Sequence, residues 1–138
     1  MSQLKQEFLI AVDFDGTIVE HAYPNIGPEV DSAFFWMKRF QEAGAQVMLW
    51  TMRGNRGADG LMLDAAVQYC RNVHNMRFDH VNTFSPQTHW TDSPKLLANI
   101  YIDDRGFGCP MRVTESGQKV VDWSIVGPSV FLMIPPME

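Results

Sequence analysis

The sequence predicts an α/β fold of the three-layer, Rossmann-like kind, in which a parallel sheet carries helices on both faces and a small C-terminal β-hairpin follows. Short apolar runs, typical of buried strands, alternate with stretches in which apolar residues recur at helical spacing. Glycine, proline and polar clusters separate these segments. Beyond residue 110 the pattern changes to strand, turn and strand.

The expected elements follow one another as strand and helix in regular alternation. Five apolar residues at 8–12 predict the first strand, and a helix is expected from Pro28 to the stop at Gly44. The remaining elements are a strand at 46–50, a helix at 61–73, a strand at 78–81, a short helix at 94–99 capped by Ser93, and a strand at 100–102. Such alternation is typical of a parallel sheet covered by helices on both faces.

The C-terminal part departs from this alternation. Residues 111–114 and 119–123 flank a Gly-containing turn and predict a hairpin. Residues 124–134 are apolar and form either a helix or a strand, which we expect to complete the core. The connections between the earlier elements are too short for an inserted cap domain. We therefore expect one domain that spans residues 1–138.

Composition and charge argue against several classes of protein. The net charge is −5 and the pI is about 5.3, which argues against an extended nucleic-acid interface. No apolar run approaches the roughly 20 residues of a membrane span, and the N-terminus lacks a signal-peptide pattern. Two cysteines give no disulfide framework, and Cys70 is expected in the core. These observations predict a cytoplasmic protein with no membrane partner.

The most informative motif is Asp13-Phe14-Asp15-Gly16-Thr17, directly after the first strand. Ligands of parallel α/β sheets bind at the carboxyl ends of the strands, where these two carboxylates lie. Gly16 permits a tight turn, and the Thr17 hydroxyl can orient the loop by a hydrogen bond. The alternative interpretation is a solvated acidic turn.

Three further features follow in order along the chain. Thr51 ends the apolar run 47–50, Lys95 follows Ser93-Pro94, and Asp103-Asp104 ends the apolar run 100–102. Together with the first motif they resemble the four motifs of the haloacid dehalogenase superfamily, and the resemblance covers residues 7–105. That superfamily is dominated by Mg²⁺-dependent phosphohydrolases, and the sequence is most similar to its small, capless bacterial and phage members.

The resemblance implies a phosphatase that acts through an aspartyl-phosphate. Asp13 is the expected nucleophile, and Asp15 is the expected general acid and base. The Thr51 side chain and the Met52 backbone amide are expected to bind the phosphate oxygens, and Lys95 to neutralise their charge. Gly16 and Thr17 belong to the same expected phosphate-binding loop.

The converging acids call for a divalent cation, since carboxylates without a positive partner repel one another, and Mg²⁺ suits them. By resemblance, the expected ligands are the Asp13 carboxylate, the Asp15 backbone carbonyl and one acid of the pair Asp103-Asp104. We favour Asp104 as the direct ligand with Asp103 behind it, although the sequence leaves this choice open.

Several nearby residues have two interpretations. Arg53 and Arg56 either reach a second anionic group of the substrate or belong to a mobile solvated loop. Arg105 is expected to orient the acids as an ion-pair partner, and His21 is a candidate for substrate contact. The four histidines show no metal-ligand spacing.

Two other functions are compatible with the same residues: a receiver-like domain phosphorylated on aspartate, and a non-catalytic phosphate-binding protein. For a phosphatase, the expected partner is a phosphorylated substrate. An open, capless site suits a macromolecular phosphate end, or a small molecule that a homo-oligomer encloses.

Overall fold

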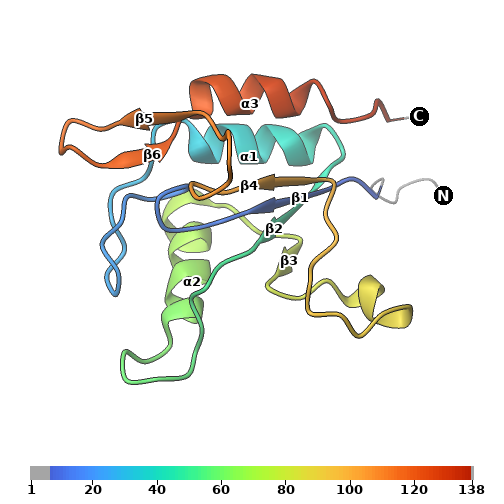
Figure 1. The fold of residues 1–138 in the computed structure, drawn as a ribbon, viewed down its shortest axis with the longest axis horizontal. Helices are drawn as coiled ribbons and strands as arrows, with labels where there is room; N and C mark the ends of the chain where they lie inside the picture. Colours follow the sequence, from blue (N-terminus) through green and yellow to red (C-terminus); the bar gives the residue numbers. More distant parts are fainter. Residues whose placement is uncertain (1–6, 138) are drawn as a thin grey trace.

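Four parallel strands form the central sheet of the computed structural model, which describes residues 7–137 (Figure 1). The strand order is β3-β2-β1-β4. The strands are β1 (Leu9–Val12), β2 (Gln46–Leu49), β3 (His80–Val81) and β4 (Ile100–Ile102). In the register, Ile10 of β1 lies opposite Val47 of β2 and Ile100 of β4. Because all four strands run in the same direction, their carboxyl ends meet at one edge of the sheet.

Helices and a separate hairpin surround this sheet. The other elements are α1 (Ala33–Glu42), α2 (Met62–His74), the 3₁₀ helix η1 (Ser85–His89), β5 (Met111–Val113), β6 (Lys119–Val121) and α3 (Trp123–Phe131). β5 and β6 pair antiparallel and are not part of the main sheet. The predicted α/β fold with a parallel sheet and a C-terminal hairpin is therefore confirmed.

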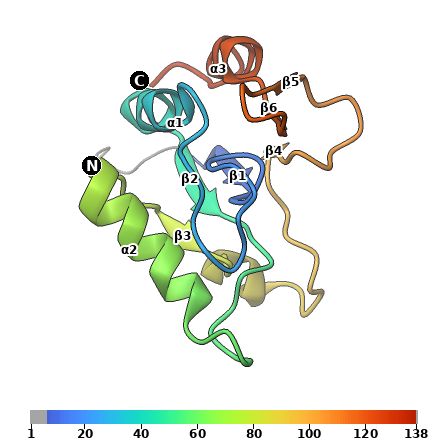
Figure 2. The same ribbon diagram turned by 90° about the vertical axis from the view of Figure 1, so that its left-hand side faces the viewer.

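All three α-helices contribute to the hydrophobic core on one face of the sheet. Alternate strand residues such as Ile10, Val12 and Val47 are fully buried in that core. Figure 2 shows α1 and α2 on the same side of the sheet and η1 on the other side. On this second face, Leu9, Ala11 and Met48 pack against Leu96, so an irregular segment covers it. The second face thus carries the 3₁₀ helix η1, and no α-helix of residues 7–137 covers it, so the prediction of helices on both faces holds only in part.

The missing helix is the one expected at 94–99. The Ser93 hydroxyl accepts a hydrogen bond from the Lys95 N–H at 3.2 Å, as a cap would, but no helix follows. Instead the Gln87 side chain donates to the Lys95 carbonyl at 2.6 Å and accepts from the Leu97 N–H at 2.9 Å. These bonds hold an irregular segment, in which Leu96 is buried and Ala98 packs beside it on the second face of the sheet. The segment carries too few apolar residues for a helix with a buried stripe.

Helix α1 begins at Ala33, five residues after the expected start at Pro28. The intervening residues pair with the loop that follows the acid motif. The Glu20 N–H donates to the Pro28 carbonyl at 2.9 Å, and the Val30 N–H donates to the Ile18 carbonyl at 2.8 Å. This pairing needs an extended backbone, which excludes a helix there and stiffens the loop.

The apolar segment after the hairpin forms a helix, α3, and completes the core as expected. Asp122 caps the helix by accepting a hydrogen bond from the Ser124 N–H at 3.1 Å. Trp123 and Val126 are buried, and a Cβ at Gly127 would lie 2.3 Å from the Trp36 ring of α1. The close approach of α3 to α1 therefore requires glycine at this position.

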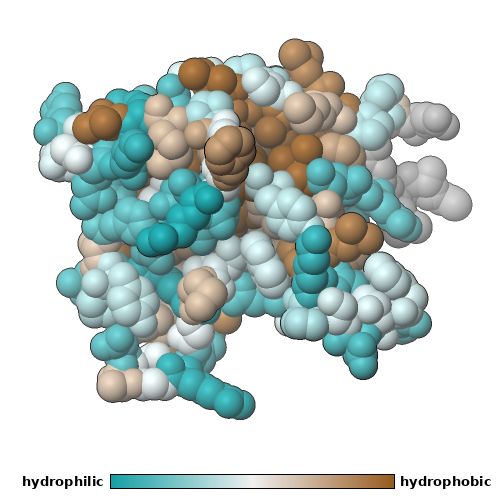
Figure 3. All heavy atoms as spheres, in the orientation of Figure 1, coloured by the Kyte–Doolittle hydropathy of each residue, from teal (hydrophilic) through white to brown (hydrophobic). Residues whose placement is uncertain are grey.

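Two further observations concern the surface. Apolar side chains gather over α3 (Figure 3), where Ile125, Leu132 and Met133 are exposed. Between residues 7 and 137, no helix combines the length and the apolar character that crossing a membrane requires.

Candidate functional site

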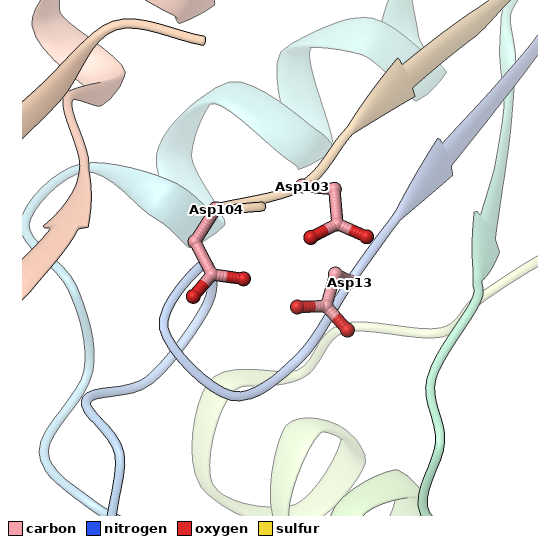
Figure 4. Close-up of side chains that lie close together, drawn as sticks. All are labelled: Asp13, Asp103 and Asp104. Carbon is pink, nitrogen blue, oxygen red and sulfur yellow. The ribbon is translucent and has the colours of Figure 1, made fainter. Parts of the chain in front are cut away.

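Three carboxylates converge at the carboxyl edge of the sheet (Figure 4). Asp13 follows β1, and Asp103 and Asp104 follow the neighbouring strand β4. One oxygen from each side chain lies within 4.8 Å of the others. The parallel pairing of β1 with β4 thus brings together acids that are about 90 residues apart in the sequence.

Burial and mutual repulsion make Asp13 a weak acid. Burial raises the pKa of its carboxyl from 3.8 to about 8, with smaller contributions from the charge of Asp103 and a hydrogen bond with Asp104. Burial likewise raises the pKa of Asp103, although the Arg105 N–H donates to Asp103 Oδ1 at 2.9 Å and lowers it in part. The cluster therefore favours a bound proton or a bound cation.

The raised pKa of Asp13 predicts that the stability of the metal-free protein depends on pH. Because the carboxyl binds its proton more tightly in the folded chain, the folded state holds more protons between about pH 4 and pH 8, and stability falls as the pH rises. Mg²⁺ is expected to raise the melting temperature more at pH 8 than at pH 5, where it must displace a proton. Thermal unfolding of the EDTA-treated chain with and without Mg²⁺ measures this, and equal shifts at both pH values would contradict it.

Gly16 and Thr17 lie between the residues that follow β1 and those that follow β4, and contact both. Thr17 is fully buried; its hydroxyl accepts a hydrogen bond from the Asp104 N–H at 3.1 Å and lies 3.4 Å from Asp13 Oδ2, to which it donates. Gly16 has a φ of +84°, and a Cβ there would lie 2.3 Å from Asp104 Oδ2. The turn can therefore approach Asp104 only because residue 16 has no side chain.

The Asp15 side chain turns to Arg53 instead of the acid cluster. The Arg53 Nε donates to Asp15 Oδ2 at 2.9 Å and the second terminal nitrogen donates to Oδ1 at 2.8 Å, a two-pronged ion pair. The same guanidinium donates to the backbone carbonyls of Pro24 and Asn25 at 3.3 and 2.8 Å. Its carbon lies 5.0 Å from the centre of the Tyr23 ring.

The structure therefore supports neither interpretation of Arg53 made from the sequence, that it reaches a second anionic group or that it belongs to a solvated loop. Its side chain is 1% exposed, and these contacts occupy the guanidinium, so it is neither solvated nor open to a second anion in this arrangement. Arg56, in contrast, is exposed. Arg53 lies in the loop that follows β2, the strand beside β1, and this position is the sequence feature that points to a partner on the acid motif.

Thr51 and Met52 lie directly after β2, beside the acid motif. The Thr51 N–H donates to Asn82 Oδ1 at 2.8 Å, and its hydroxyl accepts from the Arg53 N–H at 3.1 Å. Within the part of the chain that the structure describes, no acceptor meets the Met52 N–H. Asn82, which sequence reasoning did not identify, fixes this loop from the end of β3.

The structure does not join Lys95 to the carboxylates. It lies on the exposed part of the segment that crosses the second face of the sheet. Among residues 7–137 its ammonium group has no hydrogen-bond or ion-pair partner. Arg105 is also exposed, and it contacts Asp103 through its backbone N–H instead of the expected guanidinium ion pair.

His21 and Gln118 complete the surroundings of the acids. His21 Nε2 lies 3.0 Å from Asp104 Oδ2, so this histidine contacts a carboxylate of the cluster. Gln118 hydrogen-bonds the backbone of His21 across 97 positions of sequence. No local pattern in the sequence indicates a contact over such a separation, and Gln118 was not predicted.

The fold and this edge define the chain as an α/β protein with a carboxylate cluster at the end of a parallel sheet. No protein-family model and no curated protein matches it. The solved structure of a conserved protein from Bacteroides thetaiotaomicron is 36% identical, with 93% of each chain covered and a TM-score of 0.72. The chain belongs to the same family as that protein, whose description names no activity, ligand or partner.

Proposed function

We propose that this chain is a Mg²⁺-dependent phosphomonoesterase of the haloacid dehalogenase superfamily that works through an aspartyl-phosphate on Asp13. The observation that carries the proposal is the convergence of Asp13, Asp103 and Asp104 beside the turn at Asp15-Gly16. A nucleophilic carboxylate and a cation site then share the edge of the sheet at which ligands of parallel α/β proteins bind.

The donor set fits a hard divalent cation. The three clustered groups offer only oxygen, and the structure shows no cationic side chain paired with Asp13 or Asp103 among residues 7–137. Asp13 and Asp104 would hold Mg²⁺ through their carboxylates and Asp15 through its backbone carbonyl, with Asp103 behind them. When bound, the cation neutralises charge on the acids and on the substrate phosphate.

In the proposed first step, a carboxylate oxygen of Asp13 attacks phosphorus. A new bond forms between that oxygen and phosphorus, and the bond to the leaving oxygen breaks with its electron pair on the leaving group. Protonated Asp15 donates its proton to the leaving oxygen and becomes a carboxylate.

In the second step, water attacks the phosphorus of the aspartyl-phosphate. Asp15 accepts a proton from the water, and the bond from phosphorus to the Asp13 oxygen breaks. Inorganic phosphate leaves, and both carboxyl groups return to their starting states. The Thr51 hydroxyl and the Met52 N–H are the proposed phosphate donors. Lys95, which the structure does not join to the carboxylates, would have to move toward the phosphate to add its positive charge.

In this scheme, the ion pair between Arg53 and Asp15 is the arrangement of Asp15 before a substrate binds. Arg53 binds both oxygens of the Asp15 side chain, so in this arrangement neither oxygen is placed to donate a proton to a substrate beside Asp13. We therefore propose that Asp15 leaves Arg53 and turns toward the substrate when a phosphate binds beside Asp13.

Hydrolysis of p-nitrophenyl phosphate by the purified full chain tests the proposal. The chain is treated with EDTA and assayed before and after Mg²⁺ is restored, with expected turnover only when Mg²⁺ is present. Asp15→Asn is expected to slow an alkyl phosphate more than the aryl phosphate, because the poorer leaving group depends more on the proton. Turnover in EDTA, or Mg²⁺ binding without turnover of either ester, would contradict the proposal.

A further inference from the structure

The tip of the C-terminal hairpin is docked on the loop that follows the acid motif. The Gln118 side-chain amide donates to the His21 carbonyl at 3.0 Å, and its oxygen accepts from the His21 N–H at 3.0 Å. The Ser116 hydroxyl donates to Glu20 Oε1 at 2.9 Å. Both polar backbone groups of His21 are therefore held by one side chain of the hairpin.

The base of the hairpin and the first residue of α3 hold the acid motif itself. The Val121 N–H donates to the Gly16 carbonyl at 3.1 Å, and Trp123 Nε1 donates to the Thr17 carbonyl at 2.8 Å. The loop from the acid motif to His21 thus has C-terminal partners at both of its ends, so the hairpin fixes where the His21 side chain can reach.

The His21 ring reaches one oxygen of Asp104. Its Nε2 lies 3.0 Å from Asp104 Oδ2, and the Asp104 side chain is only 9% exposed. The ring therefore contacts Oδ2 of a carboxylate that belongs to the cluster. A hydrogen bond to a metal-binding carboxylate fixes its orientation before the metal arrives.

We propose that His21 and Gln118 are positioning residues for the carboxylate cluster: Gln118 fixes the backbone of His21, and His21 fixes the Asp104 carboxylate in an orientation that binds a divalent cation. This inference rests on the proposed metal-dependent function. It assigns to the C-terminal hairpin a role in the site, although no residue of the hairpin belongs to the cluster.

The test measures Mn²⁺ binding, by electron paramagnetic resonance of the full metal-free chain, alongside thermal unfolding without metal. His21→Ala and Gln118→Ala are expected to weaken Mn²⁺ binding about 10- to 100-fold. Gln118→Glu, which keeps the acceptor for the His21 N–H and loses the donor, is expected to fall between Gln118→Ala and the wild type. The matched control is Gln41→Ala, which removes a side-chain amide that bonds Arg77 and Asp79 on another part of the molecule.

The outcomes separate this inference from the proposed function. Weaker Mn²⁺ binding by the His21 and Gln118 variants, with a metal-free melting temperature close to that of Gln41→Ala, supports the positioning role. Wild-type affinity in both variants overturns it while leaving a Mg²⁺-dependent phosphatase intact. A wild-type chain that binds no Mn²⁺ and hydrolyses no phosphate ester overturns the inference and the proposed function together.

Discussion

Asp13→Asn is expected to reduce turnover of p-nitrophenyl phosphate by at least about 10³-fold, with the fold retained. The amide has nearly the same size as the carboxylate but neither its charge nor its nucleophilic oxygen, so no aspartyl-phosphate can form. The control is Asp64→Asn, which removes one negative charge from an exposed position on α2 and is expected to keep full activity. Substantial turnover by the Asn variant would contradict the role of Asp13 as nucleophile.

The same substitution is expected to stabilise the metal-free chain at pH 8. The wild-type carboxyl has a pKa raised to about 8 by burial and by neighbouring acids, so its ionisation in the folded state opposes folding. Asparagine has no charge to desolvate, and the fall of stability with rising pH should become shallower. Urea unfolding of the EDTA-treated proteins at pH 5 and pH 8 measures the difference. An Asn variant with the same pH dependence as the wild type would contradict the assigned cause.

Trp123→Ala is expected to lower the free energy of unfolding by about 3–5 kcal/mol. Trp123 is fully buried, packs near the Phe40 ring at 6.3 Å between centroids, and donates its indole N–H to the Thr17 carbonyl. Its removal leaves a large cavity between the sheet, α1 and α3, as well as a buried carbonyl without its donor. Urea unfolding by circular dichroism measures the loss.

Trp123→Phe separates packing from the hydrogen bond. The variant keeps an aromatic ring and loses the donor to Thr17, so a smaller loss of about 1–3 kcal/mol is expected. A Phe variant as stable as the wild type would show that the indole hydrogen bond contributes nothing. An Ala variant within about 1 kcal/mol of the wild type would contradict the role of Trp123 as a core residue.

The strands and the acids were predictable because their signals are local. Five apolar residues before Asp13 and three before Asp103 indicate buried strands, and parallel strands place the residues after their carboxyl ends at one edge of the sheet. The start of α1 could not be predicted from Pro28. The backbone of residues 28–30 hydrogen-bonds residues 18–20, and this pairing prevents a helix before Ala33. The helix expected at 94–99 did not form because the Gln87 side chain hydrogen-bonds the backbone of Lys95 and Leu97 and holds that segment in an irregular conformation.

Within the candidate site, the acidic residues could be predicted from the sequence, but the residues that they and their neighbours contact could not. The sequence predicted that Asp13, Asp15, Asp103 and Asp104 meet at one edge of the sheet. The structure brings Asp13, Asp103 and Asp104 together, whereas the Asp15 side chain pairs with Arg53. The sequence did not identify that Arg53 is buried against Asp15, or that Gln118 holds His21. Both contacts depend on which loops meet in three dimensions, and periodicity along the chain carries no information about that.

The docking of the hairpin also sets an order of events during synthesis. Asp13 emerges from the ribosome before Gln118 and Trp123, which fix the loop behind it. Contacts over such separations must wait for the whole intervening chain, because loop closure precedes any gain from the contact. A nascent chain that ends before Gln118 thus carries every acid of the cluster but lacks the bonds from Gln118 to His21 and from Trp123 to Thr17, so the loop behind Asp13 gains these partners last.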